Sequence, residues 1–419
     1  MLQVVFVLEQ AKALSSYQLS LGVNPGVGGT TYIALSTLLA VREAQSTINS
    51  GLSLYIGVLE SAPSDFHGIP VVDLRNKSEI PKWDVAILTG GSLDKLYRGE
   101  FRLKARRLIA WIHHPYDWDK ILKARSLNAE ILSVGKAQYI SNLLICGRHH
   151  HIDNIFCSQH IQKAAGWENL GQISIATAIN SNILRIGFMG ALVPSKGFHE
   201  VARNWKIIQD DMANLGIIAE LHVIGGSSLY NFSEEHESLP CDKRYGDLIT
   251  TMLGDEIGRS VFFYGTMGVE RYKLMSGCQI AIVNPGGNGE AFPATILEWL
   301  ALGIPVISSV RYGCADTMQY LPSLSITSSI QISKKIREVV TLDEAEFVRL
   351  REYCMRVSML FSSNQMAIIH QWSYLLHGMP ETVMLNEFLH PNIYLLLIAQ
   401  WLRMLASRLK QKARCLLRP

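Results

Sequence analysis

The stretch that decides the fold runs from Ile280 to Ser309 and reads IAIVNPGGNGEAFPATILEWLALGIPVISS. It opens with a short apolar run, Ile280–Val283, that has the composition of a buried strand. A glycine-rich loop follows, then a helical stretch at Thr295–Leu302 and a second apolar strand at Pro305–Ser308. Strand, helix and strand in this order form a βαβ unit, whose two strands are parallel. The stretch therefore predicts an α/β protein with a parallel sheet.

The same alternation of short apolar runs and helical stretches extends over both halves of the chain. We predict two doubly wound, Rossmann-like domains that face each other across a cleft, residues 1–183 and 184–376. A basic, amphipathic, helical tail at 377–419 follows, and the crossing of the last helices of the second domain back to the first is an open alternative. A long helical stretch, broken once or twice, is predicted at Asp343–Leu376. The further predicted strands are Leu2–Leu8, Leu52–Leu59, Val71–Leu74, Val85–Leu88, Leu108–Ile112, Ile131–Val134, Ile155–Cys157, Ile173–Ala176, Arg185–Met189, Leu221–Ile224 and Val261–Tyr264.

Composition and charge exclude several classes of protein. Of the 419 residues, 48% are hydrophobic and 18% are charged, which excludes a disordered or fibrous chain. The formal net charge of +3 argues against a bulk nucleic-acid binder. The 7 cysteines show no C-x-x-C spacing, which is typical of a reducing compartment without disulfides or a zinc ribbon. The N-terminus lacks the basic start of a signal peptide, so we expect a cytoplasmic protein.

Two glycine-containing motifs lie where strands are predicted to end. Asn24–Ala40, NPGVGGTTYIALSTLLA, places glycines before a helix, which suits a phosphate cradle and a plain glycine turn about equally. Gly187–Phe198, GFMGALVPSKGF, places Lys196 at the entrance of a helix. A lysine at this point can neutralise a diphosphate, and the alternative is a solvated loop lysine.

Two glutamates in the deciding stretch are the main candidates for binding a ligand. Glu290 lies at the mouth of the glycine-rich loop, and Glu298 lies within an otherwise apolar helical segment. A buried carboxylate needs partners, and paired sugar hydroxyls suit a group that accepts two hydrogen bonds at once. The alternative for Glu298 is the polar stripe of an amphipathic helix.

Taken together and in this order, the motifs resemble the retaining nucleotide-sugar glycosyltransferases of the GT-B fold, glycosyltransferase family 4 (glycosyl transferases group 1). The resemblance covers most of the chain and is strongest from Arg185 to Ser309. There GALVPSKG, the strand end Gly225-Gly226, VFFYGTM, the E-x7-E pair and ALGIPVISS follow one another. The resemblance implies transfer of a sugar, with retention, from a nucleotide-diphosphate donor to a hydroxyl of a glycan or glycolipid. Cell-envelope polysaccharide or glycoconjugate biosynthesis is the setting that it implies.

The resemblance also implies roles for single residues. Glu290 would hold hydroxyls of the donor sugar, Glu298 the ribose hydroxyls, and Lys196 the diphosphate. His113 would act near the anomeric carbon and the acceptor, with His114 as the alternative. The other donor-binding residues that it implies are Gly28, Gly29, Gly265, Phe292, Pro293 and Ala294, with Thr30 as a further candidate.

One position departs from the family pattern. Many relatives carry Arg directly after the glycine that ends the Gly187–Gly190 strand, and this chain has Ala191. Diphosphate neutralisation then depends on Lys196 and helix N-termini, which points to weaker donor binding, another basic residue in this role, or lost activity. The resemblance implies no cofactor and no obligatory metal. With no second carboxylate evident near His113, we expect front-face attack of the acceptor.

Two basic segments predict contact with an anionic membrane surface, which makes the expected location the inner face of the cell membrane. RGEFRLKARR, from Arg98 to Arg107, has one acid, and the tail interleaves apolar residues with basic ones, the pattern of an interfacial helix. A disordered basic end or a helix packed on the body is the alternative for the tail. The residues predicted to contact the membrane are Arg98, Arg102, Lys104, Arg106, Arg107, Trp401, Arg403, Arg408 and Lys410.

Two other functions fit the same sequence. A nucleotide-sugar 2-epimerase shares the two-domain fold, and a catalytically silent partner subunit of another transferase is compatible with Ala191. The base, sugar, acceptor and linkage carry no readable code in the sequence.

Overall fold

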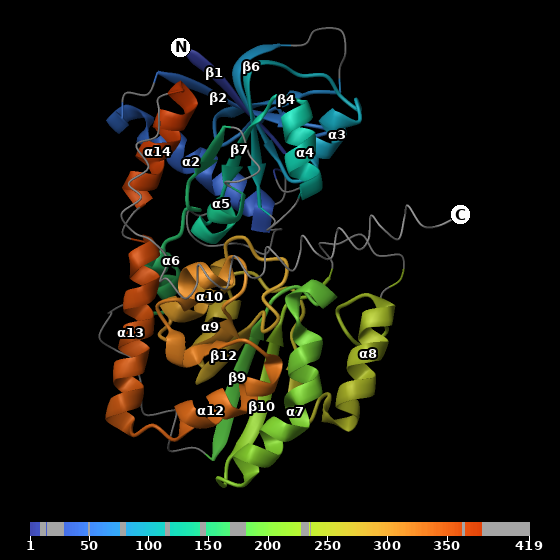
Figure 1. Cartoon of the computed structure of the whole chain (residues 1–419), viewed down its shortest axis with the longest axis vertical. Coiled ribbons are helices and arrows are strands. Elements are labelled where there is room, and N and C mark those ends of the chain that lie inside the picture. The colour runs from blue at the N-terminus through green and yellow to red at the C-terminus, as the bar shows by residue number, and fades with distance from the viewer. Residues whose placement is uncertain are drawn as a thin grey trace.

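The structure is a computed structural model that describes residues 1–8, 14, 29–48, 51–75, 81–113, 118–142, 148–167, 182–227, 234, 236–362 and 365–378. These residues form two α/β domains, each built on a largely parallel sheet and joined end to end (Figure 1). The predicted α/β class and two-domain architecture are confirmed. The predicted tail and the predicted strand Ile173–Ala176 lie outside the described residues.

The N-terminal domain is built on a sheet with the order β3-β4-β2-β1-β5-β6-β7-β8. All described pairings are parallel except the β3–β4 hairpin. The central strand β1 is fully buried from Val4 to Val7, as expected for a parallel strand covered on both faces. Its elements are β1 (Leu2–Val7), α2 (Gly29–Ile48), β2 (Leu52–Val58), β3 (Asp65–Phe66), β4 (Ile69–Asp73), β5 (Lys82–Thr89), α3 (Ser92–Tyr97), β6 (Lys104–Ile112), α4 (Trp118–Ser126), β7 (Glu130–Ser133), α5 (Lys136–Asn142), β8 (His149–His151) and α6 (Ser158–Ala164).

The C-terminal domain is built on a parallel sheet with the order β11-β10-β9-β12-β13-β14. This is the Rossmann order, and the winding reverses between β9 and β12, where a crevice opens at the strand ends. Gly187 in β9 lies under the buried Trp299 of α10, and a Cβ there would be 2.2 Å from the indole. The elements are β9 (Ile183–Met189), the 3₁₀ turn η2 (Pro194–Lys196), α7 (Phe198–Ala213), β10 (Ile218–Ile224), α8 (Lys243–Leu253), η3 (Gly254–Glu256), β11 (Val261–Phe263), α9 (Arg271–Ser276), β12 (Ile280–Val283), α10 (Ala294–Ala301), β13 (Val306–Ser309), α11 (Cys314–Met318), η4 (Pro322–Leu324), β14 (Ser325–Ile326), η5 (Ser329–Gln331) and α12 (Ile332–Val340).

One predicted strand is wrong. Ile155–Cys157 is not a strand, because β8 already occupies the sheet edge beside β7. Its apolar side chains are buried all the same, with Phe156 only 5% exposed, so they pack as part of an irregular segment leading out of the sheet. No helix in the described ranges is long and apolar enough to cross a membrane.

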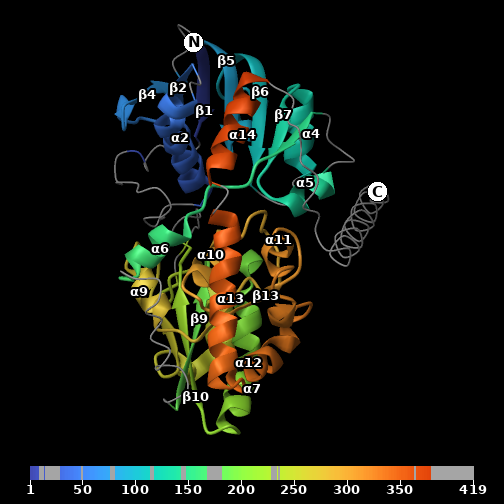
Figure 2. The same cartoon turned by 90° about the vertical axis from the view of Figure 1, so that its left-hand side faces the viewer.

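The last two described helices lead the chain back to its first domain. The predicted helical stretch Asp343–Leu376 consists of α13 (Glu344–Ser362) and α14 (Gln365–His377). Helix α13 packs against α10, whereas α14 packs against α2 of the N-terminal domain (Figure 2). Trp372 of α14 is 1% exposed and contacts Phe6 and Trp111, with ring centroids 5.8 and 4.7 Å away.

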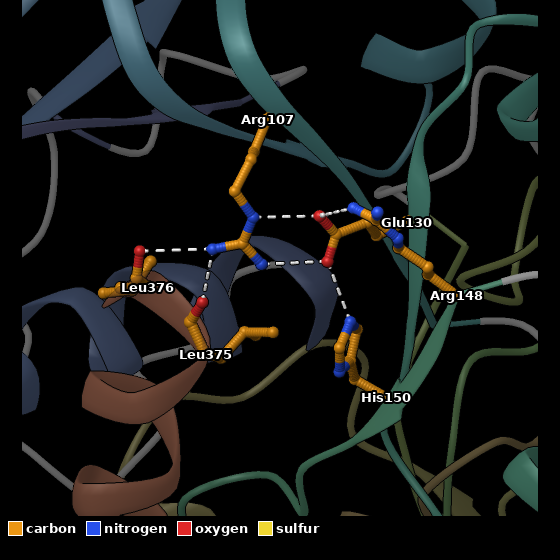
Figure 3. Close-up of polar contacts among 6 residues, drawn as sticks. All are labelled: Arg107, Glu130, Arg148, His150, Leu375 and Leu376. Carbon is orange, nitrogen blue, oxygen red and sulfur yellow. Dashed lines mark hydrogen bonds and ion pairs between the residues drawn. The ribbon is translucent and has the colours of Figure 1, made fainter. Parts of the chain in front are cut away.

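Arg107 fixes the C-terminal end of α14 (Figure 3). Its Nη1 donates to the carbonyls of Leu375 and Leu376 at 2.7 and 3.3 Å, while Nε and Nη2 donate to the Glu130 carboxylate at 2.9 and 2.8 Å. Carbonyls in the last turn of a helix lack partners within the helix, and a guanidinium satisfies them. The prediction that Arg107 contacts a membrane is therefore corrected, because its guanidinium is bound to Glu130 and α14 and its side chain is only 23% exposed.

Further hydrogen bonds join the domains elsewhere. Asp316 Oδ1 accepts the backbone N–H of Ala137 at 2.9 Å, and Gln162 Nε2 donates to the carbonyl of Ala301 at 2.8 Å. The backbone N–H of Ser158 donates to Ser362 Oγ at 2.6 Å. Because the bonds lie on α5, α6, α11 and the helices beside them, they hold the two sheets in one mutual orientation.

The Asp316 contact predicts a pH-dependent stability. Burial, together with the nearby Asp153, raises the pKa of Asp316 to about 7. A carboxyl whose pKa is higher in the folded than in the unfolded state destabilises the fold when it ionises. The stability lost grows as pH rises from about 4, the unfolded pKa, to the folded pKa. Asp316→Asn keeps the acceptor oxygen and removes this ionisation. We therefore expect the wild-type Tm to fall relative to that of Asp316→Asn between about pH 4 and pH 7, and the difference to stay constant above that.

The control is Asp255→Asn, since Asp255 is an exposed residue of η3. Its Tm should follow the wild type throughout. Parallel Tm curves for wild type and Asp316→Asn would contradict the prediction.

Candidate functional site

A cavity of about 650 Å³ lies between the domains and is lined by residues of both. Its walls are made by loops that leave β5, β6 and β7 on one side and β9, β10, β11 and β12 on the other. These are carboxyl ends of parallel strands, the place where open α/β sheets bind ligands. The topology therefore makes this cavity the candidate site.

The loop between β12 and α10 brings Glu290 to the cavity. Gly287 and Gly289 both have φ of 71°, a left-handed conformation that favours glycine. Asn284 Nδ2 donates to the carbonyl of Asn288 at 2.8 Å and closes the loop on itself. The Glu290 carboxylate forms an ion pair with Lys196, and both side chains keep some exposure, 13% and 21%. Two residues predicted from separate motifs thus meet at one point.

Glu298 lies deeper in the wall, on α10, and is paired with Arg271 of α9. Arg271 Nε and Nη2 lie 3.3 and 3.2 Å from Glu298 Oε2, and the two side chains are 6% and 11% exposed. The Tyr32 phenol, from α2 of the facing domain, is close enough to be influenced by both charges, and burial raises its pKa. The Arg271–Glu298 pair therefore lies where the two domains approach each other.

Two helices from opposite domains begin at the cavity. Gly29 opens α2 and Ala294 opens α10, both line the cavity, and neither helix carries an acidic residue in its first turn. The amino end of a helix bears a partial positive charge that attracts anions, phosphate above all. Among the described lining residues the formal charges balance, with Lys120, Lys196 and Arg271 against Asp94, Glu290 and Glu298. The site therefore suits a ligand that combines phosphate with many hydroxyls.

His113 forms part of the N-terminal wall, at the end of β6. Its ring packs against that of Trp111, with the centroids 4.6 Å apart and the planes tilted by 49°. Trp111 in turn contacts Trp372 of α14 edge-on, so the ring that backs the imidazole is itself held by α14.

Comparisons with known proteins agree with this geometry. Two solved structures are similar over nearly the whole chain. A glycosyltransferase from Rickettsia africae ESF-5 has a TM-score of 0.60 at 11% identity, covering 91% of this chain and 99% of the other. HepE from Anabaena, crystallised with UDP and glucose, has a TM-score of 0.58 at 13% identity, covering 90% of this chain and 100% of the other. The fold is GT-B. Residues 172–352 match the family model of glycosyl transferases group 1. No curated protein matches the sequence.

Most of the predicted site residues line the GT-B cleft. Pro293 does not line the cavity and instead caps α10. Gly265, with φ of 68°, lies in the turn after β11, and its carbonyl accepts the N–H of Gly225 at 2.8 Å. Both hold the wall, and their predicted donor contact stays a prediction. Gly28 and His114 lie outside the described residues. The lining residues are Gly29, Thr30, His113, Lys196, Glu290, Phe292, Ala294 and Glu298.

Several lining residues were not predicted. Thr266, Met267 and Arg271 follow β11, and Asn154 lies on the segment after β8. The signal that could have found them is positional, because every loop after a parallel strand opens at the same edge of its sheet. On the N-terminal side the same rule would have found Thr89, which ends β5, and Gly90, Gly91 and Asp94, which follow it.

The aromatic backing of His113 predicts a large effect of truncating Trp372. Trp372→Ala removes a fully buried indole and is expected to lower the free energy of unfolding by about 3–5 kcal/mol, measured by urea denaturation. Trp372→Phe keeps a ring against Trp111 and is expected to cost less. As a control, Tyr374→Ala on the same helix, where Tyr374 is 49% exposed, should change stability little. Equal losses for Trp372→Ala and Tyr374→Ala would show that this packing does not hold α14.

Proposed function

We propose that the protein is a glycosyltransferase that moves a sugar from a nucleotide-diphosphate donor to a hydroxyl of a glycan or glycolipid. The observation that carries this proposal is the meeting of Lys196, Glu290 and Glu298 with two helix N-termini in one interdomain cavity. The group 1 match over residues 172–352 supports it. That HepE, of the same fold, was crystallised with UDP and glucose points to a UDP-sugar as one donor to test.

Lys196 and Glu290 have complementary tasks in this proposal. The diphosphate of the donor would bind the Lys196 ammonium, and the sugar hydroxyls would bind the Glu290 carboxylate. Each side chain thus exchanges its ion-pair partner for a contact with the donor. The amino ends of α2 and α10 share the diphosphate charge with Lys196. The two helix ends are fixed parts of the wall, so their share in stabilising the leaving group needs no reorganisation.

The proposed reaction breaks the bond between the anomeric carbon and the diphosphate oxygen and forms one to the acceptor oxygen. The acceptor lies on the His113 side, and its hydroxyl proton passes to the departing diphosphate, as front-face attack with retention requires. The carboxylate on this side, Asp94, is held by Lys123 Nζ at 2.6 Å, which disfavours its use as a covalent nucleophile. Lys196 and helix termini take the place of a metal in this scheme. An inverted product, seen by NMR of the anomeric proton, would overturn the retaining part.

Lys196 and Glu290 give the sharpest test of donor binding. A thermal-shift screen with UDP-, GDP-, ADP- and dTDP-sugars first identifies the donor, because a ligand of the folded state raises Tm. Lys196→Ala should then weaken both the sugar donor and its free nucleoside diphosphate by roughly ten- to a hundredfold, the value of a hydrogen bond to a charged group. Glu290→Gln should weaken the sugar donor and leave the free nucleoside diphosphate nearly unchanged.

The control is Lys206→Ala, since Lys206 is 78% exposed on α7. Its affinities should equal those of the wild type. If no nucleotide sugar stabilises the wild type, the enzyme proposal fails and a silent partner subunit takes its place. If the donor alone yields its C2 epimer, the protein is an epimerase.

We further propose that the N-terminal domain contacts an anionic membrane surface at the cytoplasmic face through Arg98, Arg102, Lys104 and Arg106. All four are exposed and lie on β6 or just before it. A surface of this kind would hold the cleft near a lipid-borne acceptor.

Changing these four residues to Gln should lower binding to vesicles of phosphatidylcholine with phosphatidylglycerol by roughly tenfold or more, since each basic residue is worth about 1 kcal/mol near an anionic surface. The measurement is vesicle sedimentation. The matched control changes Arg203, Lys206, Lys243 and Lys334 of the C-terminal domain, whose side chains are 52–78% exposed. Equal loss in both variants, or no binding by the wild type, would contradict the proposal.

A further inference from the structure

Arg271 is the most enclosed charged group on the cavity wall. It opens α9 and is 5% exposed as a residue, yet it lines the cavity. Its Nη1 donates to the Gly268 carbonyl at 2.7 Å, and its Nη2 donates to the Tyr272 hydroxyl at 2.6 Å. The guanidinium also lies over the Tyr272 ring, 4.3 Å from the centroid. These contacts leave the group one position, so it is a fixed part of the wall.

From this position Arg271 holds Glu298. Nε and Nη2 both reach a single carboxylate oxygen, Oε2, at 3.3 and 3.2 Å. A carboxylate offers about four acceptor positions, so Arg271 occupies only part of this capacity. The guanidinium gives Glu298 an ion-pair partner in a setting where an unpaired carboxylate would be costly. The pair therefore supplies an oriented, charged acceptor facing the cavity.

The pair is poorly explained by stability alone. A buried ion pair contributes little net stability compared with apolar side chains of similar volume. Arg271 also ties the loop after β11, through Gly268, to α10, and that loop contributes Thr266 and Met267 to the same wall. Because its nitrogens are committed to Glu298, Tyr272 and Gly268, Arg271 does not take over the diphosphate in place of the arginine that is absent at Ala191.

We propose that Arg271 is a positioning residue that orients Glu298 toward the ribose hydroxyls and thereby makes the site selective for ribonucleotides. The inference rests on the proposed function and deepens it. Without the Arg271 fork, the Glu298 carboxylate would lose the two contacts that orient it, and both hydroxyl contacts would weaken together. A ligand without those hydroxyls would bind as before.

The test compares UDP with 2′,3′-dideoxy-UDP by calorimetry, or the matching pair if the donor screen selects another base. The wild type should prefer the ribonucleotide by roughly tenfold or more, the value of hydrogen bonds to a charged group. Arg271→Gln should remove most of this preference while changing the dideoxy affinity less than about threefold. Arg271→Lys keeps the charge without the fork and should recover only part of the preference.

Two further variants keep the test decisive if Arg271→Gln folds poorly. The double variant Arg271→Gln/Glu298→Gln leaves no buried charge unpaired. Its preference for the ribonucleotide should be no smaller than that of Glu298→Gln alone, because the two residues act as one unit. Arg351→Gln is the structural control: Arg351 is also 5% exposed, but it bonds the carbonyls of Leu302 and Gly303 at the other end of α10. It should lower Tm and leave the ribose preference intact.

The outcomes separate the two proposals. A wild type that prefers UDP, with Arg271 variants that keep this preference, overturns the role of Arg271 and leaves the proposed function standing. A wild type that binds no nucleoside diphosphate overturns both. If Arg351→Gln also loses the preference for the ribonucleotide, the effect comes from a general loosening of α10, and the inference is overturned.

Discussion

The return of the chain to its first domain is the constraint on which the cleft depends. Helix α14 reaches the N-terminal sheet by two different means: burial of Trp372 against Phe6 and Trp111, and capture of its last carbonyls by Arg107 (Figure 3). The first is non-directional and supplies most of the energy, while the second requires one position along the helix. Together they fix how closely α14 packs on the N-terminal sheet and which of its residues lie against it. Because Trp111 also touches His113, the helix that closes the fold also supports the wall of the cavity.

The cavity contains two ion pairs of different character. Lys196 and Glu290 keep 21% and 13% of their side chains exposed, so water or a ligand can replace one partner. Arg271 and Glu298 are 6% and 11% exposed and are held by Tyr272 and Gly268, so replacing either partner would leave a desolvated charge. The first pair is suited to exchange with a ligand, and the second to presenting a fixed acceptor. One cavity thus combines an adjustable contact with a rigid one.

The parts of this structure that the sequence predicts are those set by local order. Ile280–Ser309 folds as the βαβ unit that its pattern indicates, and Lys196 and Glu290 follow strand ends that the topology must bring to one edge. The sequence predicts Arg107 at a membrane-facing surface because a run of basic residues carries no information about which side chain bonds to the rest of the protein. That choice is decided by the free carbonyls of α14, which come from 268 residues further along the chain. The sequence does not single out Arg271 for the same reason, since its partner Glu298 lies on another helix.

Ala191 affects the charge of the cavity wall. An arginine there would add a positive charge to a wall whose described formal charges otherwise balance. With alanine, attraction of an anionic ligand falls to Lys196 and to the amino ends of α2 and α10, whose partial charges act only within the first turn. On the proposed function, binding then depends less on long-range attraction and more on contacts made after arrival, which are the hydroxyl contacts proposed for Glu290 and Glu298. A site of this kind discriminates by the hydroxyls of its ligand rather than by its phosphates, so the orientation of the two carboxylates carries more of the specificity than it would beside an arginine.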